Sequence, residues 1–170
     1  MEAVKLNGIE KEMNQLILHS DIYRKGDEKP PHFLIKQKND NGRAYVTNYI
    51  ADTLYENKLR RFGGLDICLE YTLDGSLKQV KQIFSDISSN AVYTNEYEGV
   101  VAMDVTKLAR YLNEFQVDYF LENIVRVAEN ATMVIYYDGC AGKRMDALVD
   151  RIKEALHAQT LREAAVWRLV

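Results

Sequence analysis

The segment Gly99-Val100-Val101-Ala102-Met103-Asp104 decides the fold, because an uninterrupted apolar run ends there in a carboxylate. A strand that is covered on both faces has this pattern, and such coverage is typical of parallel sheets. A second buried-strand pattern, over residues 132–137, is followed by Asp138 and Gly139. The two segments therefore predict buried strands of a parallel sheet, each with an acidic residue at its carboxyl end.

Other strand and helix patterns alternate around these two runs. Strands are expected over residues 32–36 and 65–71, with a further candidate at 164–170, and apolar residues recur at helical spacing over 8–19, 43–58, 77–87, 115–128 and 145–156. Asp74-Gly75 is expected to form a turn, and Asn113 to cap a helix. Alternating strands and helices predict right-handed βαβ units. We therefore expect an α/β protein, with a five-stranded parallel sheet between helices in a three-layer α/β/α arrangement.

Length and composition favour one soluble globular domain. The chain has 170 residues, of which 47% are apolar and 28% are charged. Its two cysteines, Cys68 and Cys140, lie in different segments, which suits a reducing cytosol and offers neither a zinc site nor a disulfide framework. The apolar runs are too short to cross a bilayer. We expect a cytoplasmic protein with no membrane association and no metal site.

The charged side chains are close to balance and interspersed. Twenty-two basic and 25 acidic residues give a formal net charge of −3, so no large field attracts nucleic acid, and nucleic-acid binding is not expected. The short basic stretch at 58–62 is better explained as a solvated helix end. The three histidines, His19, His32 and His157, lack metal-ligand spacing and are expected at the surface or at an edge.

The loop after the first strand occupies the place of a phosphate loop, because ligands of parallel sheets bind beyond the carboxyl ends of the strands. A phosphate loop needs a first glycine, a lysine for the phosphates and a hydroxyl for magnesium. Gln37, Arg43 and Ala44 stand at those positions, and only Gly42 fits the pattern. Gly42-Arg43 is thus either an ordinary strand-to-helix turn or a remnant anion site. Asp104 is likewise either a capping or salt-bridged carboxylate, or an inherited position without metal chemistry.

The succession of these features resembles the core of an AAA+ ATPase, in particular the rubisco-activase-like and sporulation protein K-like branch. The resemblance is carried by Leu6–Glu12 (the lead-in), Gly42–Ala51 (the Gly-Lys-Thr-Thr helix start), Val100–Val105 (the Walker B strand), and Val134–Tyr137 with Lys143–Asp146 (the sensor-1 strand and loop). It implies a P-loop NTPase-like fold over residues 1–170, with a helical lead-in at 1–30 and a core at 31–170. Because the sequence ends at Val170, we expect it to lack the C-terminal lid of complete AAA+ modules.

The same resemblance implies a nucleotide site at Gly42, Arg43, Ala44 and Asp104. In active members a lysine offsets phosphate charge, a hydroxyl and an aspartate hold magnesium, and a neighbouring glutamate polarises water. Arg43, Ala44 and Val105 replace three of these groups. The resemblance therefore favours a vestigial site with no catalytic residue and no cofactor.

The expected function follows from two features of the sequence: the AAA+-like fold pattern is retained, and residues needed for ATP hydrolysis are replaced. We expect a catalytically inactive AAA+-like domain that serves as a protein-interaction, scaffolding or regulatory module, with other AAA+ modules among its candidate partners. One alternative is a domain that binds ATP or ADP without hydrolysis. Another is an ATPase subunit whose missing groups come from a second chain.

Overall fold

The computed structural model describes residues 31–37, 47–48, 68–89, 99–108, 113–129, 131–139, 142–156 and 160–166. Its elements, in chain order, are β1 (Pro31–Gln37), β2 (Cys68–Thr72), α4 (Leu77–Ser89), β3 (Gly99–Asp104), α6 (Glu114–Ala128), β4 (Ala131–Asp138), α7 (Lys143–Leu156) and β5 (Thr160–Val166). The expected lead-in at 1–30 lies outside the described residues. So does the expected helix at 43–58, apart from Thr47 and Asn48, which are helical.

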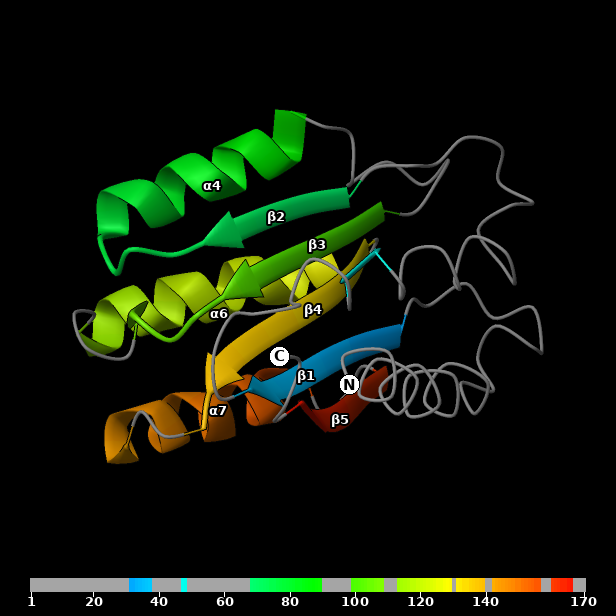
Figure 1. The fold of residues 1–170 in the computed structure, drawn as a ribbon. Helices are drawn as coiled ribbons and strands as arrows, with labels where there is room; N and C mark the ends of the chain where they lie inside the picture. Colours follow the sequence, from blue (N-terminus) through cyan, green and yellow to red (C-terminus); the bar gives the residue numbers. More distant parts are fainter. Residues whose placement is uncertain are drawn as a thin grey trace.

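The strands form one parallel sheet in the order β2-β3-β4-β1-β5 (Figure 1). The chain leaves β1 toward the β2 edge of this sheet. It leaves β4 in the opposite direction and crosses β1 to reach β5. The expected α/β class and the parallel sheet are confirmed.

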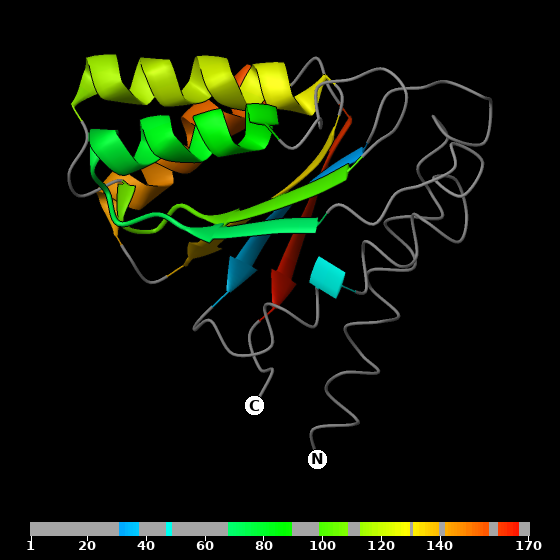
Figure 2. The same cartoon turned by 90° about the horizontal axis from the view of Figure 1, so that it is seen from above.

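Three helices, α4, α6 and α7, cover the same face of the sheet (Figure 2). Their crossovers lead from β2 to β3, from β3 to β4 and from β4 to β5, which all advance in one direction across the sheet. Right-handed crossovers in one direction place their helices on one face. The crossover from β1 to β2 advances the other way. The short helical segment 47–48 lies over the opposite face of the sheet (cyan in Figure 2). The rest of the helical layer expected on that face lies outside the described residues.

The central strands are buried on both faces, as the apolar run at 99–103 predicts. Side chains at alternate positions pack with the helices into one core, to which β3 contributes Val101 and Met103 and β4 contributes Met133 and Ile135. The intervening Val100 and Ala102 are also buried. The apolar faces of α4, α6 and α7 complete this core with Val80, Phe84, Ile87, Phe120, Ile124, Val127, Leu148 and Ile152.

Helix α6 begins where the sequence indicates. The Asn113 side chain accepts a hydrogen bond from the Gln116 N–H at 3.0 Å, and the Gln116 side chain accepts one from the Asn113 N–H at 2.9 Å. This capping box confirms Asn113 as the cap.

The helix expected over residues 115–128 is confirmed, but Phe115, the first apolar residue of that pattern, is 84% exposed and does not belong to the buried face. Phe115 lies on the outward face of α6 with the exposed Asp118 and Glu122, about half a turn around the helix from the buried Ile124.

Histidine 32 also departs from expectation. It was expected at the surface or an edge, but it is fully buried, because β1 is an interior strand with β4 on one side and β5 on the other. Its Nδ1 accepts a hydrogen bond from the Met133 backbone N–H at 3.0 Å. Burial lowers the pKa of the His32 imidazole to about 4. The ring is therefore a neutral core group.

Two strand boundaries differ from the sequence patterns. Strand β2 is described from Cys68, and residues 65–67 lie outside the described part. Strand β5 begins at Thr160, before the expected start at 164, because it pairs with β1 along its whole length although its sequence mixes charged and apolar residues.

The turn at Asp74-Gly75 is confirmed, with Gly75 at a φ of 94° that suits glycine. Within the described part, no helix has the length and apolarity needed to span a membrane.

Candidate functional site

The carboxyl ends of the strands place Asp104 among residues of both neighbouring strands. Asp104 is the last residue of β3, and it pairs with Thr72 of β2 and Tyr136 of β4. One strand further along, Gln37 of β1 pairs with Asp138 of β4. Because the chain leaves β1 and β4 in opposite directions, the crevice at their carboxyl ends is a topological switch point, where ligands of such sheets bind.

Of the four expected site residues, Asp104 alone lies in the described part of the chain. Gly42, Arg43 and Ala44 follow β1 in the sequence and lie outside the described residues. Asp104 lies at the end of its strand, as expected. The described part of the site is therefore built from β2, β3, β4 and Thr47.

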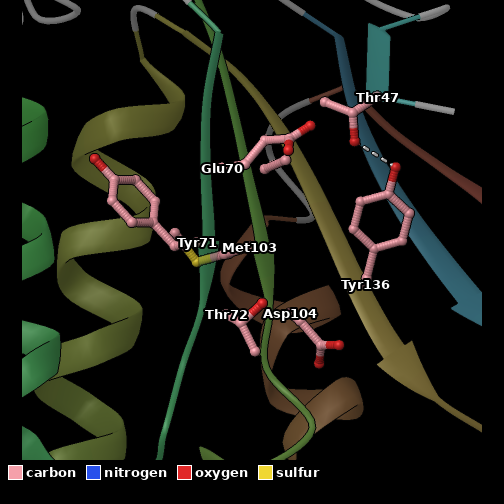
Figure 3. A pocket seen from close by; sticks show the side chains of 8 residues that line it. Thr47, Glu70, Tyr71, Thr72, Met103, Asp104 and Tyr136 are labelled. Carbon is pink, nitrogen blue, oxygen red and sulfur yellow. Dashed lines mark hydrogen bonds between the residues drawn. The ribbon is translucent and has the colours of Figure 1, made fainter. Parts of the chain in front are cut away.

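A pocket of about 200 Å³ opens beside Asp104 on the face opposite the three helices (Figure 3). Glu70, Thr72, Asp104 and Tyr136 line it from the strands, and Thr47 lies across from them. The intervening Tyr71 and Met103 also border the pocket, although their side chains pack toward the helix layer. The pocket is thus lined by hydroxyl and carboxyl groups from alternate strand positions.

A buried hydrogen bond closes one side of this pocket. The Thr47 Oγ1 and the Tyr136 hydroxyl lie 2.6 Å apart, and both residues are fully buried (Figure 3). The bond ties the segment after β1 to β4 across 89 positions of the chain. A buried hydroxyl pair of this kind contributes to stability mainly because breaking it leaves a polar group out of water.

We expect the substitution Tyr136→Phe to lower the free energy of unfolding by about 1–2 kcal/mol, because it removes one partner of this buried bond. Thr47→Val should cost a similar amount. Urea denaturation of both single variants and the double variant measures their coupling, which we expect to be about 1 kcal/mol. Strictly additive effects would show that the two hydroxyls do not stabilise one another.

The Asp104 carboxylate takes part in the turn that follows its own strand. Its Oδ1 accepts a hydrogen bond from the Thr106 N–H at 2.9 Å. The Thr106 Oγ1 in turn accepts one from the Asp138 N–H at 3.0 Å. This chain of bonds joins the ends of β3 and β4, and it uses Asp104 in the manner of a turn-forming aspartate.

The residue after Asp104 points away from the site. Val105 is fully buried in the helix-side core, and its N–H donates to the Tyr136 carbonyl at 3.0 Å. The resemblance places the water-polarising glutamate at this position. A buried aliphatic side chain can neither accept a proton nor orient water.

The loop after β2 is held by its own hydrogen bonds. The Asp74 Oδ1 accepts from the Ser76 N–H at 2.8 Å, and the Asp74 N–H donates to the Gln79 Oε1 at 2.6 Å. Hydrogen bonds from Ser76 lower the pKa of the exposed Asp74 carboxyl. Asp74 therefore has a local structural role at this edge.

Sequence reasoning missed Glu70, Thr72, Thr47 and Tyr136 as members of this site. For the strand residues a signal was present, because positions 70, 72, 102, 104 and 136 share one face by the two-residue period of strands. Two polar residues at alternate positions of β2 also contradict burial on both faces. No comparable signal marks Thr47, whose position depends on a contact across 89 residues.

The chemistry of this pocket is limited by its lining groups. Glu70 and Asp104 supply carboxylates, and the other polar lining groups are hydroxyls. Among the described residues, no group of three or more His, Cys, Asp and Glu side chains is arranged to hold a metal ion. Two carboxylates in one small pocket disfavour an unaccompanied phosphate, because like charges repel there.

The described strands and helices form a parallel α/β fold with a topological switch point between β1 and β4. No protein-family model and no curated protein sequence matches the chain. Among solved structures, the Aeropyrum pernix ORC1 protein in complex with DNA is similar, with a TM-score of 0.54 and 11% identity over 92% of this chain. Drosophila ORC bound to DNA is also similar, with a TM-score of 0.52, 11% identity and 96% of this chain covered.

The two similar structures differ in how much of their own length is matched. The match spans 44% of the Aeropyrum chain and 94% of the Drosophila chain. This chain therefore corresponds to less than half of the Aeropyrum pernix protein. At 11% identity the likeness shows a shared fold.

Proposed function

We propose that this chain is a catalytically inactive AAA+-like domain that acts by protein contact, as an interaction, scaffolding or regulatory module in the cytoplasm. The proposal covers residues 1–170 as one domain, with 31–170 as its core. It includes the resemblance to the rubisco-activase-like and sporulation protein K-like branch, with Gly42, Arg43, Ala44 and Asp104 as the vestiges of a nucleotide site.

One observation carries this proposal: Asp104 helps to form a turn while the next residue, Val105, is buried in the core. Hydrolysis of a phosphoanhydride needs a magnesium-supporting aspartate and a group that polarises water. Here the aspartate accepts a hydrogen bond from its own loop, and the neighbouring position has no polar atom in its side chain. Arg43 and Ala44 add two further departures in the sequence.

We expect purified protein to hydrolyse ATP no faster than background in the presence of magnesium, since the groups that activate water are missing. Asp104→Ala should leave this rate unchanged, as should the control Asp150→Ala on the exposed surface of α7. A coupled phosphate-release assay measures the rate. Turnover that Asp104→Ala abolishes and Asp150→Ala preserves would overturn the proposal.

The same assay tests whether a second chain completes the site. AAA+ modules commonly share catalytic groups across an interface, so activity that rises more steeply than protein concentration would favour a shared site over an inactive domain. Gel filtration with and without ATP gives an independent measurement. A monomer at all concentrations, with no turnover, supports the inactive domain.

A second candidate function is nucleotide binding without hydrolysis, which the topological switch point between β1 and β4 favours. Against it, the described pocket of about 200 Å³ is smaller than the roughly 300–1,000 Å³ of small-molecule sites. Calorimetry with ATP and ADP distinguishes the two candidates. Heat of binding that is lost in Arg43→Ala would favour the nucleotide; no heat favours the scaffold.

We do not propose nucleic-acid binding for this chain. Both similar structures contain DNA, so the comparisons do not argue against nucleic-acid binding. The argument against it is the formal net charge of −3, since nonspecific DNA binding depends on neutralising phosphates with lysine and arginine. Fluorescence anisotropy with labelled duplex DNA at low and high salt tests this expectation. A salt-sensitive rise in anisotropy would contradict it.

A further inference from the structure

A groove runs between α6 and α7 on the outside of the helix layer. These helices contact each other, and their connections place both on the same face of the sheet (Figures 1 and 2). The groove has a volume of about 620 Å³ and is open to solvent. It lies on the opposite side of the sheet from the pocket beside Asp104, so it is a separate feature of the molecule.

The groove has an apolar floor and acidic walls. Leu121, Val125 and Ala155 provide the apolar surface. Asp118, Glu122 and Glu154 provide three carboxylates, and Arg151, which pairs with Asp118 at the partly exposed surface, provides one guanidinium. The lining is therefore anionic, in a chain whose charges are otherwise close to balance.

Phe115 extends the apolar surface of α6 toward its N-terminus. Residues three and seven positions later, Asp118 and Glu122, share its side of the helix because of the helical period. Phe115 is 84% exposed, and it is the one large hydrophobic side chain of the described residues with such exposure. An aromatic side chain in this position is typical of a binding anchor, because it gains much apolar contact when covered.

We propose that this acidic groove, lined by residues of α6 and α7 and extended by Phe115, binds a basic amphipathic helix of a partner protein. Its seven lining residues are Asp118, Leu121, Glu122, Val125, Arg151, Glu154 and Ala155. A helix-in-groove complex buries the apolar face of the partner on an apolar floor, and flanking charges set its orientation. The carboxylates here favour lysine or arginine beside the apolar stripe of the partner. The inference names the contact surface for the proposed protein-interaction role.

A synthetic helical peptide tests the groove directly. The probe is a peptide of about 18 residues with leucine at helical spacing and lysine on the flanks, a length that permits helix formation. Two control peptides have the same length: one carries glutamate in place of lysine, and one has a scrambled order. Fluorescence anisotropy gives the affinity, and amide chemical shifts in ¹⁵N-labelled protein locate the contact. We expect the lysine peptide alone to bind and to shift residues of α6 and α7.

A pair of matched double variants then tests the role of charge. Glu122→Lys with Glu154→Lys reverses two charges of the groove, and Asp146→Lys with Asp150→Lys makes the same change in net charge at exposed α7 positions outside its lining. We expect the groove variant to weaken binding by at least about tenfold and the control by about twofold or less. Phe115→Ala should weaken binding by about fivefold. Circular dichroism checks that each variant is folded.

The outcomes separate this inference from the proposed function. Three results would contradict binding of a basic helix in the groove. They are an equal loss of affinity in both double variants, equal binding of the scrambled peptide, and chemical-shift changes confined to elements other than α6 and α7. A dimer in sedimentation that Glu122→Lys with Glu154→Lys dissociates would show instead that a second copy of the chain fills it. ATP hydrolysis would refute the proposal that the domain is catalytically inactive and would leave the peptide result unaffected. Lack of peptide binding in a protein without ATPase activity would refute only the proposal that the groove binds a helix.

Discussion

Replacing Phe120 with alanine is expected to lower the free energy of unfolding by about 3–5 kcal/mol, the usual cost of deleting a buried phenyl ring. Phe120 is fully buried at the centre of the helix-side core, and its ring lies 6.0 Å from that of Phe84 between ring centroids. It therefore joins α6 to α4 and to the sheet beneath. The loss includes both the transfer of the ring from water and the cavity that the smaller side chain leaves. Urea denaturation at neutral pH measures it.

Phe115→Ala is the matched control, since it makes the same chemical change in the same helix. Because Phe115 is 84% exposed, its removal should alter stability by no more than about 0.5 kcal/mol. This contrast would show that the Phe120 ring stabilises the folded protein, whereas the exposed Phe115 ring adds little stability and can contact a partner. Similar losses in the two variants would contradict the burial of one ring and the exposure of the other.

Much of this fold is predictable from local patterns. The apolar run at 99–103, the capping residue Asn113 and the helical spacing along α7 each depend on residues close in sequence, and the structure agrees with each. The exposure of Phe115 follows from the same helical period, which places it about half a turn from Ile124 and on the side of Asp118 and Glu122. Being apolar does not by itself put a residue on the buried face of a helix.

The candidate site was less predictable. Asp104 could be placed because a charged residue ends an apolar strand, whereas Tyr136 reads as one more apolar position of β4. Its contact with Thr47 depends on which strands become neighbours, and sequence alone leaves that order open. The burial of His32 has the same origin, because only the strand order makes β1 an interior strand.

Because His32 is buried, protonation of its imidazole should strongly change the stability of the protein as the pH falls. The imidazole is fully buried, and its Nδ1 accepts the hydrogen bond of the Met133 N–H, so the neutral ring must carry its proton on Nε2. A proton on Nδ1 would place two donors against each other. Burial accordingly lowers the pKa of His32 from its ordinary value of 6.5 to about 4.

We expect acidification to destabilise the protein through this residue. Because the pKa in the folded state lies below that in the unfolded state, the unfolded chain binds more protons between about pH 6.5 and pH 4. The stability that the neutral ring provides is thus complete above pH 6.5 and is lost as the pH falls through this window. A shift from 6.5 to about 4 corresponds to about 3 kcal/mol in total.

His32→Asn separates this effect from the titration of carboxylates, because asparagine keeps an acceptor oxygen near the Nδ1 position and does not titrate. The smaller side chain should lower stability at neutral pH, and this deficit relative to wild type should shrink as the pH falls, because only the wild-type imidazole takes up a proton. Wild-type protein should therefore lose about 2 kcal/mol more than the variant between pH 7 and pH 4.5 when both are unfolded in urea. Parallel pH profiles would mean that His32 is protonated equally in the folded and unfolded chains. That result would contradict the burial of β1 between β4 and β5, on which the placement of the switch point depends.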